Sequence, residues 1–264
     1  MKRRLKQFAE RLTAYKVWIE RSTHRRELEE LIHSLRARAT VAPLIRIGPV
    51  GDGGYLLPND LDGVTACVSP GVSFEVGFDQ AMADRAIDVY MADASVEGPP
   101  QANDRFHFTK KFIDIVEDER HMRLDTMCAS ILNPSDGDLI LQMDIEGAEW
   151  RVLLDASHQT LKKFRIIVIE FHDLNRMFGQ FSFGLIKATF GKLLQTHSVV
   201  HLHPNNVSNP TYFDGFAVPP VMEMTFYRND RPFSDSKIGP YPHQLDVDNV
   251  STRPSVALPR CWQT

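Results

Sequence analysis

Hydrophobic residues recur in the first part of the chain at the spacing of an α-helix. The first apolar stripe is made of Leu5, Phe8, Leu12, Tyr15 and Ile19, at intervals of three and four residues, with Arg and Lys between them. The register slips at residues 21–23, and a second stripe then runs to Leu35. We therefore expect a helical arm over residues 1–42. It packs on the body or on a second subunit, or else it lies as a basic amphipathic helix on a membrane surface.

From residue 44 onward, short apolar runs alternate with stretches of helical periodicity. We expect strands at residues 64–69, 86–92, 105–112, 138–143, 165–169, 199–202 and 221–227. Helices are expected at residues 74–85, 120–132 and 183–196. Apolar strands that alternate with helices predict a doubly wound α/β sheet, here in a main domain over residues 43–230. Residues 231–264 hold five prolines, and we expect them to form an extended tail packed on this domain.

The charge of the chain is unevenly distributed. Residues 1–38 carry 11 Lys and Arg against 5 Asp and Glu, whereas the net charge of the whole chain is −4. An acidic main domain argues against nucleic acid as a partner. No apolar run approaches the roughly 18 residues of a membrane span, and the three cysteines lack metal-binding spacing. We therefore expect a cytoplasmic protein whose arm, within residues 1–38, contacts a membrane surface or forms a homo-oligomer.

The residues after the first two strands suit a nucleotide-containing cofactor, because ligands of an open α/β sheet bind at the carboxyl ends of its strands. A tight turn with Gly71 follows the first strand, where a ligand approaches the backbone closely. Asp93 follows the second strand and is placed to bind two ribose hydroxyls. The turn lacks the GxGxxG pattern, which disfavours a dinucleotide-dependent oxidoreductase. Asp52 and Tyr55 belong to a glycine-rich segment, and we expect them at the cofactor site as part of a hairpin lid.

Titratable side chains follow the fourth, fifth and sixth strands. They are Asp144 and Glu146, Glu170 and His172, and His201 and His203. Because these strand ends meet at one edge of the sheet, we expect the side chains to converge there. Mixed carboxylate and imidazole groups bind divalent cations such as Mg or Mn, and they serve equally well as a general base.

Several short motifs are distinctive in this sequence. They are DGGY (52–55), SPGVSFE (69–75), LDTM (124–127), LQMDIEGAEW (141–150), IEFHDL (169–174), HLHPNN (201–206) and PPVMEMTF (219–226). Together they resemble the FkbM-type family of methyltransferases, which use S-adenosylmethionine (SAM). The resemblance implies a Rossmann-like class I methyltransferase sheet, with strand order 3-2-1-4-5-7-6 and the last strand antiparallel. It also implies that Ser69, Gly71 and Ser73 line the methionine part of SAM, that Asp93 binds the ribose and that Asp144 lies beside the transferred methyl group.

From the residues and the resemblance together, we expect an O-methyltransferase that acts on a hydroxyl of a saccharide or glycan. A sugar hydroxyl is a weak acid, so its methylation needs a base or a metal ion. We expect Asp144, Glu170 and His203 to hold a Mg or Mn ion, with His172 as the general base or a further ligand. Two alternatives stay open: an O-methyltransferase of a polyketide or lipid natural product, and a non-catalytic scaffold that retains the fold.

Overall fold

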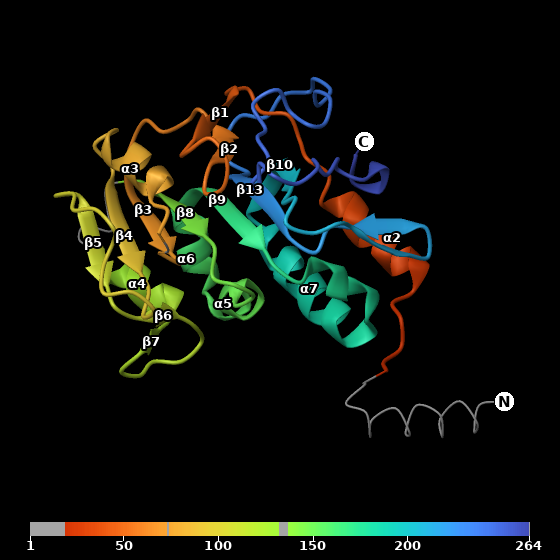
Figure 1. The fold of residues 1–264 in the computed structure, drawn as a ribbon, viewed down its shortest axis with the longest axis horizontal. Coiled ribbons are helices and arrows are strands. Elements are labelled where there is room, and N and C mark those ends of the chain that lie inside the picture. The colour runs from red at the N-terminus through yellow and green to blue at the C-terminus, as the bar shows by residue number, and fades with distance from the viewer. Residues whose placement is uncertain (1–18, 73, 132–136, 264) are drawn as a thin grey trace.

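The computed structural model describes residues 19–72, 74–131 and 137–263, so that Ser73 lies outside the described residues. At its centre is a seven-stranded sheet in the order β10-β13-β9-β8-β3-β4-β5 (Figure 1). Its strands are β3 (Val64–Pro70), β4 (Asp88–Ala92), β5 (Phe106–Thr109), β8 (Asp138–Met143), β9 (Phe164–Phe171), β10 (His197–Pro204) and β13 (Met222–Arg228). β13 is antiparallel to both of its neighbours, and the other neighbouring pairs are parallel. This is the strand order that the resemblance implies, and the expected Rossmann-like α/β fold is confirmed.

Helices cover one face of the sheet, and a helix and a hairpin cover the other. The first core includes residues from α2 (Arg25–Ser34), α4 (Leu124–Ser130), α5 (Glu149–Asp155), α6 (His158–Lys163) and α7 (Gln180–Leu193). The second core lies under α3 (Gly77–Ala83) and the hairpin of β1 (Leu44–Ile47) and β2 (Tyr55–Pro58). Shorter elements lie in the connections: β6 (Phe112–Ile113), β7 (His121–Met122), η1 (Leu174–Phe178), β11 (Thr211–Phe213), β12 (Phe216–Val218) and η2 (Arg260–Trp262). Because successive side chains of a strand point to opposite faces, the buried strands supply apolar side chains to both cores.

The segment between β4 and α4 differs from the expectation. The single strand expected at residues 105–112 is divided into β5 and β6, which lie in different sheets. Residues 121–122 form β7, which pairs with β6, so the helix expected from residue 120 begins only at Leu124. The helix expected at residues 74–85 is also shorter and begins at Gly77. In the segment between β5 and α4, pairing between β6 and β7 decides the local structure, and a local sequence pattern contains no signal for such pairing.

The helical arm is described from residue 19 onward. Residues 19–24 are not helical, in agreement with the slip in the apolar register, and α2 follows them. Leu28, Leu31 and Ile32 of α2 are buried in the first core. The helix expected over the preceding residues lies outside the described part of the chain. None of the helices that the structure describes is long and apolar enough to cross a membrane.

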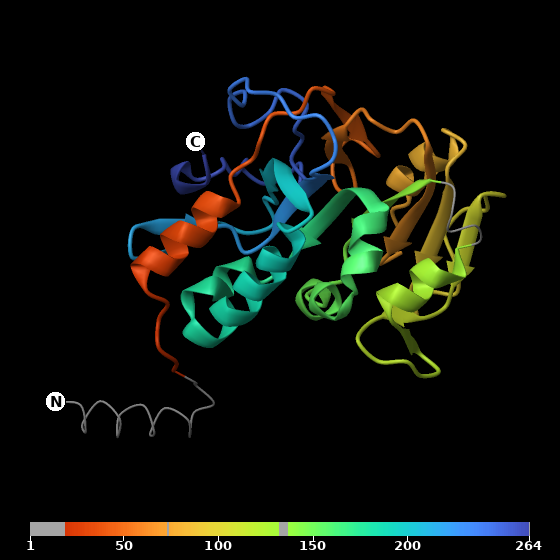
Figure 2. The ribbon, with the colours of Figure 1, turned by 180° about the vertical axis from the view of Figure 1, so that it is seen from behind.

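Residues 231–263 form an extended tail that passes close to the β1–β2 hairpin and to the end of β10 (Figures 1 and 2). Its end is anchored by Trp262, which is fully buried and donates its Nε1 hydrogen to the carbonyl oxygen of Ala217 at 3.0 Å. Its middle is anchored by Asp246, whose Oδ1 lies 3.0 Å from His201 Nε2 of β10. The tail therefore covers the edge of the sheet at which β10 ends.

Candidate active site

A cavity of about 630 Å³ lies at the carboxyl ends of β3, β4 and β8. Gly71 lines it, with a φ of +93°. A Cβ atom at this position would lie 1.7 Å from the carbonyl oxygen of Asp144. Glycine is therefore required for the end of β3 to approach the end of β8 so closely, because any other residue would clash in a backbone conformation that L-residues avoid.

Four acidic residues line the same cavity, and two of them, Asp93 and Asp114, are held by hydrogen bonds. Asp93, which is 8% exposed, follows β4, and its Oδ1 accepts hydrogen bonds from the backbone N and the Oγ of Ser95 at 2.6 Å each. These bonds fix the carboxylate at the cavity wall. Asp114 accepts two hydrogen bonds from Arg151, at 2.7 and 2.8 Å, so the charge of this guanidinium is already paired. The structure thus places Gly71 and Asp93 together in one cavity, where a cofactor site is expected.

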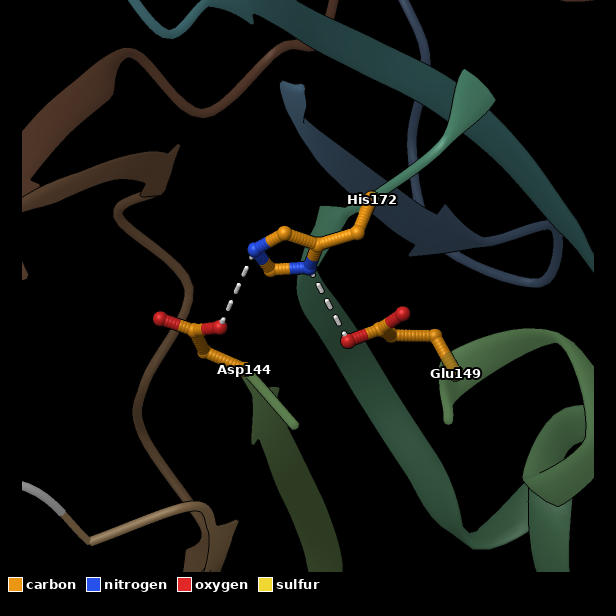
Figure 3. Close-up of side chains that lie close together, drawn as sticks. All are labelled: Asp144, Glu149 and His172. Atoms are coloured by element: carbon orange, nitrogen blue, oxygen red, sulfur yellow. Dashed lines mark hydrogen bonds and ion pairs between the residues drawn. The ribbon is translucent and has the colours of Figure 1, made fainter. Parts of the chain in front are cut away.

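Asp144, Glu149 and His172 form a cluster at the ends of β8 and β9 (Figure 3). The ring of His172 lies between the two carboxylates, with Nδ1 3.2 Å from Glu149 Oε1 and Nε2 3.9 Å from Asp144 Oδ1. Glu146 Oε2 is 3.5 Å from the same Nε2. Asp144 and Glu146 also line the cavity. Both ring nitrogens of His172 therefore face acidic groups, and the side with Nε2 faces the cavity lining.

Glu149 is the residue of this cluster that sequence reasoning missed. Its side chain is fully buried, and its Oε1 accepts hydrogen bonds from the backbone N atoms of Ile145 and Gly147 at 3.1 Å each. Left-handed backbone at Glu146 (φ 53°) and Gly147 (φ 94°) turns the chain after β8 toward this carboxylate. The available signal was an acidic residue in the first turn of a helix, a position that favours a carboxylate accepting backbone hydrogen bonds.

The combined effects of burial and neighbouring charges raise the pKa values of both Asp144 and His172. Burial raises the pKa of Asp144 to about 7; the charge of His172 lowers it, and those of Glu146 and Glu149 raise it. Burial alone would lower the pKa of His172. The hydrogen bond to Glu149 and the charges of Glu149, Asp144 and Glu146 outweigh burial, so the pKa of His172 is raised above its ordinary value. The cluster can therefore take up or release a proton in the physiological range.

Glu170 and His203, which were expected to bind a metal ion together with Asp144, are not members of this cluster. Glu170 is in β9 and His203 in β10, and Glu223 of β13 is the register partner of both. Glu170 Oε1 accepts a hydrogen bond from Asn205 Nδ2 at 2.7 Å. Within residues 19–72, 74–131 and 137–263, Asp144 forms a group that could hold a metal ion with Glu149 and His172. Neither Glu170 nor His203 belongs to this group.

Ser69, Tyr55 and Asp52 are not among the residues that line this cavity. Ser69 is buried and donates its hydroxyl hydrogen to Gln142 Oε1 at 2.8 Å, while Gln142 Nε2 lies 3.5 Å from Tyr55 Oη. Asp52 is exposed and accepts a hydrogen bond from the tail residue Asn249 at 3.1 Å. The expected hairpin does form, as β1 and β2, but Tyr55 points into the core beneath it.

Comparison with known proteins gives a family and a set of structural relatives. Residues 63–196 match the family described as the methyltransferase FkbM domain. No curated protein matches the chain. Among solved structures, the chain is similar to the N-methyltransferase NodS from Bradyrhizobium japonicum, at 9% identity over 63% of this chain and 86% of that chain, with a TM-score of 0.33. A putative methyltransferase from Thermoplasma acidophilum is similar at 6% identity over 71% of this chain and 84% of that chain, with a TM-score of 0.33.

The family match assigns the chain to a family, and the strand order of the sheet agrees with this assignment independently. The matched residues include Gly71, Asp93, Asp144, Glu149 and His172, whereas DGGY (52–55) and HLHPNN (201–206) lie outside them. The match covers residues 63–196 of 264, slightly more than half of the chain. The chain therefore belongs to the FkbM methyltransferase domain family.

Proposed function

We propose that this protein transfers a methyl group from SAM to a hydroxyl of a saccharide or glycan, with His172 as the general base. Membership of the family implies a methyltransferase that uses SAM. The observation that carries the finer proposal is the position of His172, with Nδ1 against the buried carboxylate of Glu149 and Nε2 beside Asp144 at the cavity. A base held in this way is oriented before the acceptor arrives.

The residues around the cavity fit SAM. The volume of about 630 Å³ is in the range of ligand pockets, and it lies at the strand ends where such sheets bind nucleotides. Asp93 presents a fixed carboxylate suited to the two hydroxyls of a ribose. The bare backbone at Gly71 leaves room for close approach. When bound, SAM supplies an electrophilic methyl group on a sulfonium ion.

His172 would accept the proton of the acceptor hydroxyl. Glu149 Oε1 accepts hydrogen bonds from two backbone N atoms, so the hydrogen of a neutral His172 ring is placed on Nδ1, and Nε2 keeps its lone pair. The proton of the acceptor oxygen would pass to Nε2 as the methyl group moves from the sulfur of SAM to that oxygen, and the sulfur would keep the electron pair of the broken carbon–sulfur bond. The resulting imidazolium is stabilised by Glu149 on one side and by Asp144 and Glu146 on the other.

A divalent cation is a second candidate for activating the hydroxyl. Asp144, Glu149 and His172 each offer a ligand atom, and these atoms all lie within 4.8 Å of one another. Carboxylate and imidazole donors suit Mn or Mg, and a bound cation would lower the pKa of the acceptor hydroxyl. Glu149 Oε1 already accepts two backbone hydrogen bonds. This favours a role in orienting the general base His172 over a role as a ligand of a metal ion.

Calorimetric titration of SAM into the purified protein is the first test, repeated with EDTA and with added Mg or Mn. We expect SAM binding that does not depend on metal, and methylation of a sugar hydroxyl that EDTA does not abolish. The change His172→Ala should leave SAM binding intact and lower turnover by about a hundredfold or more. His158→Ala is the matched control, because His158 is exposed at the start of α6. Undiminished turnover in His172→Ala would refute the assignment of the base.

A further inference from the structure

A row of polar side chains crosses the sheet beside the proposed active site. His203, Glu223 and Glu170 are register partners on β10, β13 and β9. Asp144 extends the row by one strand, because the preceding residue, Met143, pairs with Ile169. His203, Glu223 and Glu170 are only 6%, 5% and 4% exposed. The row therefore leads from the proposed reaction centre, under a cover, to the edge of the sheet at β10.

The tail contacts this row through Asn249. Asn249 Nδ2 donates hydrogen bonds to Glu223 Oε1 at 2.6 Å and to Asp52 Oδ1 at 3.1 Å. Because both partners are carboxylates, only the amide nitrogen can face them, and the orientation of the amide group is fixed. The other end of the amide, Oδ1, is buried and has no hydrogen-bond partner in the described part of the chain.

Two anchors hold Asn249 in place along the tail. Asn206 binds the next residue, Val250, in both directions: its Oδ1 accepts from the backbone N at 2.8 Å, and its Nδ2 donates to the carbonyl oxygen at 2.9 Å. On the other side, Asp246 lies against His201 and His203, at 3.0 and 3.6 Å. The polar side chains of HLHPNN thus fix the tail, and Asn249 is preorganised between these anchors.

The unpartnered buried atoms near the row predict the chemistry of a ligand. Asp144 Oδ1 and Asn249 Oδ1 are acceptors without donors, and His203 Nε2, in a side chain that is only 7% exposed, has no partner either. Arg46 donates to the carbonyl oxygens of Pro49 and Gly51 at 3.0 and 2.7 Å, and its charge lowers the pKa of Glu223 in the row. A ligand that satisfies the two oxygen acceptors supplies hydrogen-bond donors, and a phosphate or carboxylate on it would meet the carboxyl groups of the row.

We propose that the tail forms one wall of the acceptor pocket, and that Asn249 is a specificity-determining residue whose Oδ1 accepts a hydrogen bond from a hydroxyl of a neutral polyol. This inference rests on the proposed function. The row that binds the hydroxyl groups of the acceptor also disfavours an acceptor that carries a negative charge.

The test compares acceptors and variants in the full chain. Transfer of tritiated methyl from SAM is measured with glucose and inositol, with glucose 6-phosphate and glucuronate, and with glucosamine. We expect the neutral sugars to be preferred over the anionic ones by about tenfold or more. In Asn249→Ala, the loss of one hydrogen bond should raise KM for the neutral sugar by about tenfold, with kcat and the Kd for SAM nearly unchanged. Thr252→Ala is the control, because Thr252 is an exposed residue of the same tail.

Each outcome decides the matter. A preference for the phosphorylated or amino sugar overturns the neutral acceptor. Unchanged KM in Asn249→Ala overturns its role, as does a general increase in amide exchange across residues 243–254 with loss of SAM binding, which would show a structural role. A protein that binds SAM but methylates none of the neutral sugars overturns this inference and leaves the proposed cofactor standing. A protein that does not bind SAM overturns both.

Discussion

Gly71 is the position in the proposed cofactor site where the addition of one methyl group, by substitution with alanine, should be most destabilising. Its φ of +93° costs an L-residue about 1–2 kcal/mol. The added Cβ would also lie 1.7 Å from the carbonyl oxygen of Asp144, so the end of β3 or β8 must move, and overpacking of this kind costs about 1–3 kcal/mol. We therefore expect Gly71→Ala to lower the free energy of unfolding by about 2–5 kcal/mol, a large part of the stability of a typical domain.

Two other glycines separate the two contributions. Gly147 has a φ of +94°, but a Cβ added there would have no atom within 4 Å, so Gly147→Ala should cost only the backbone strain, about 1–2 kcal/mol. Gly98 has open space, and its φ lies outside the left-handed region, so Gly98→Ala should change stability by less than about 1 kcal/mol. Urea unfolding of the three variants measures these differences directly.

The same variants test the location of the cofactor. Because Gly71 and Asp144 both line the cavity, movement of either backbone should weaken SAM binding by about tenfold or more, whereas Gly98→Ala should bind SAM normally. Calorimetry on the folded variants gives the Kd. Equal destabilisation of Gly71→Ala and Gly147→Ala would refute the clash, and an unchanged Kd for SAM in Gly71→Ala would refute the placement of the cofactor in this cavity.

Two further predictions concern buried carboxylates. Glu149→Gln removes the charge that raises the pKa of His172, so that pKa should fall, as measured by NMR titration of the ring; a constant value would contradict the role of Glu149. Burial raises the pKa of Asp79 from 3.8 to about 7, and its Oδ1 has no hydrogen-bond partner in the described residues. As the pH rises from 4 to 8, the free energy of unfolding of the wild type should therefore fall by up to about 4 kcal/mol relative to that of Asp79→Asn. Parallel pH profiles of the two proteins in chemical unfolding would contradict this.

The fold could be predicted from the sequence because its strands are buried on both faces and are marked by continuous apolar runs. The run DLILQM coincides with β8 at both ends, residues 138–143. The rule that ligands bind at the carboxyl ends of such strands then identified Gly71 and Asp93 at the cavity, and Asp144 and His172 at the cluster. These residues follow their strands directly, so their position in space is set by the strand itself.

The tertiary structure decided which of these groups meet. Glu149 reaches His172 because the left-handed turn at residues 146–147 folds α5 back against β9. Glu170 and His203 are separated by β13, a strand that comes later in the chain than both. Asn206 binds the tail 44 residues further along the chain. Local patterns report burial and strand ends, whereas contacts between distant segments depend on how strands pair and how the tail returns, and these are fixed only when the whole sheet is packed.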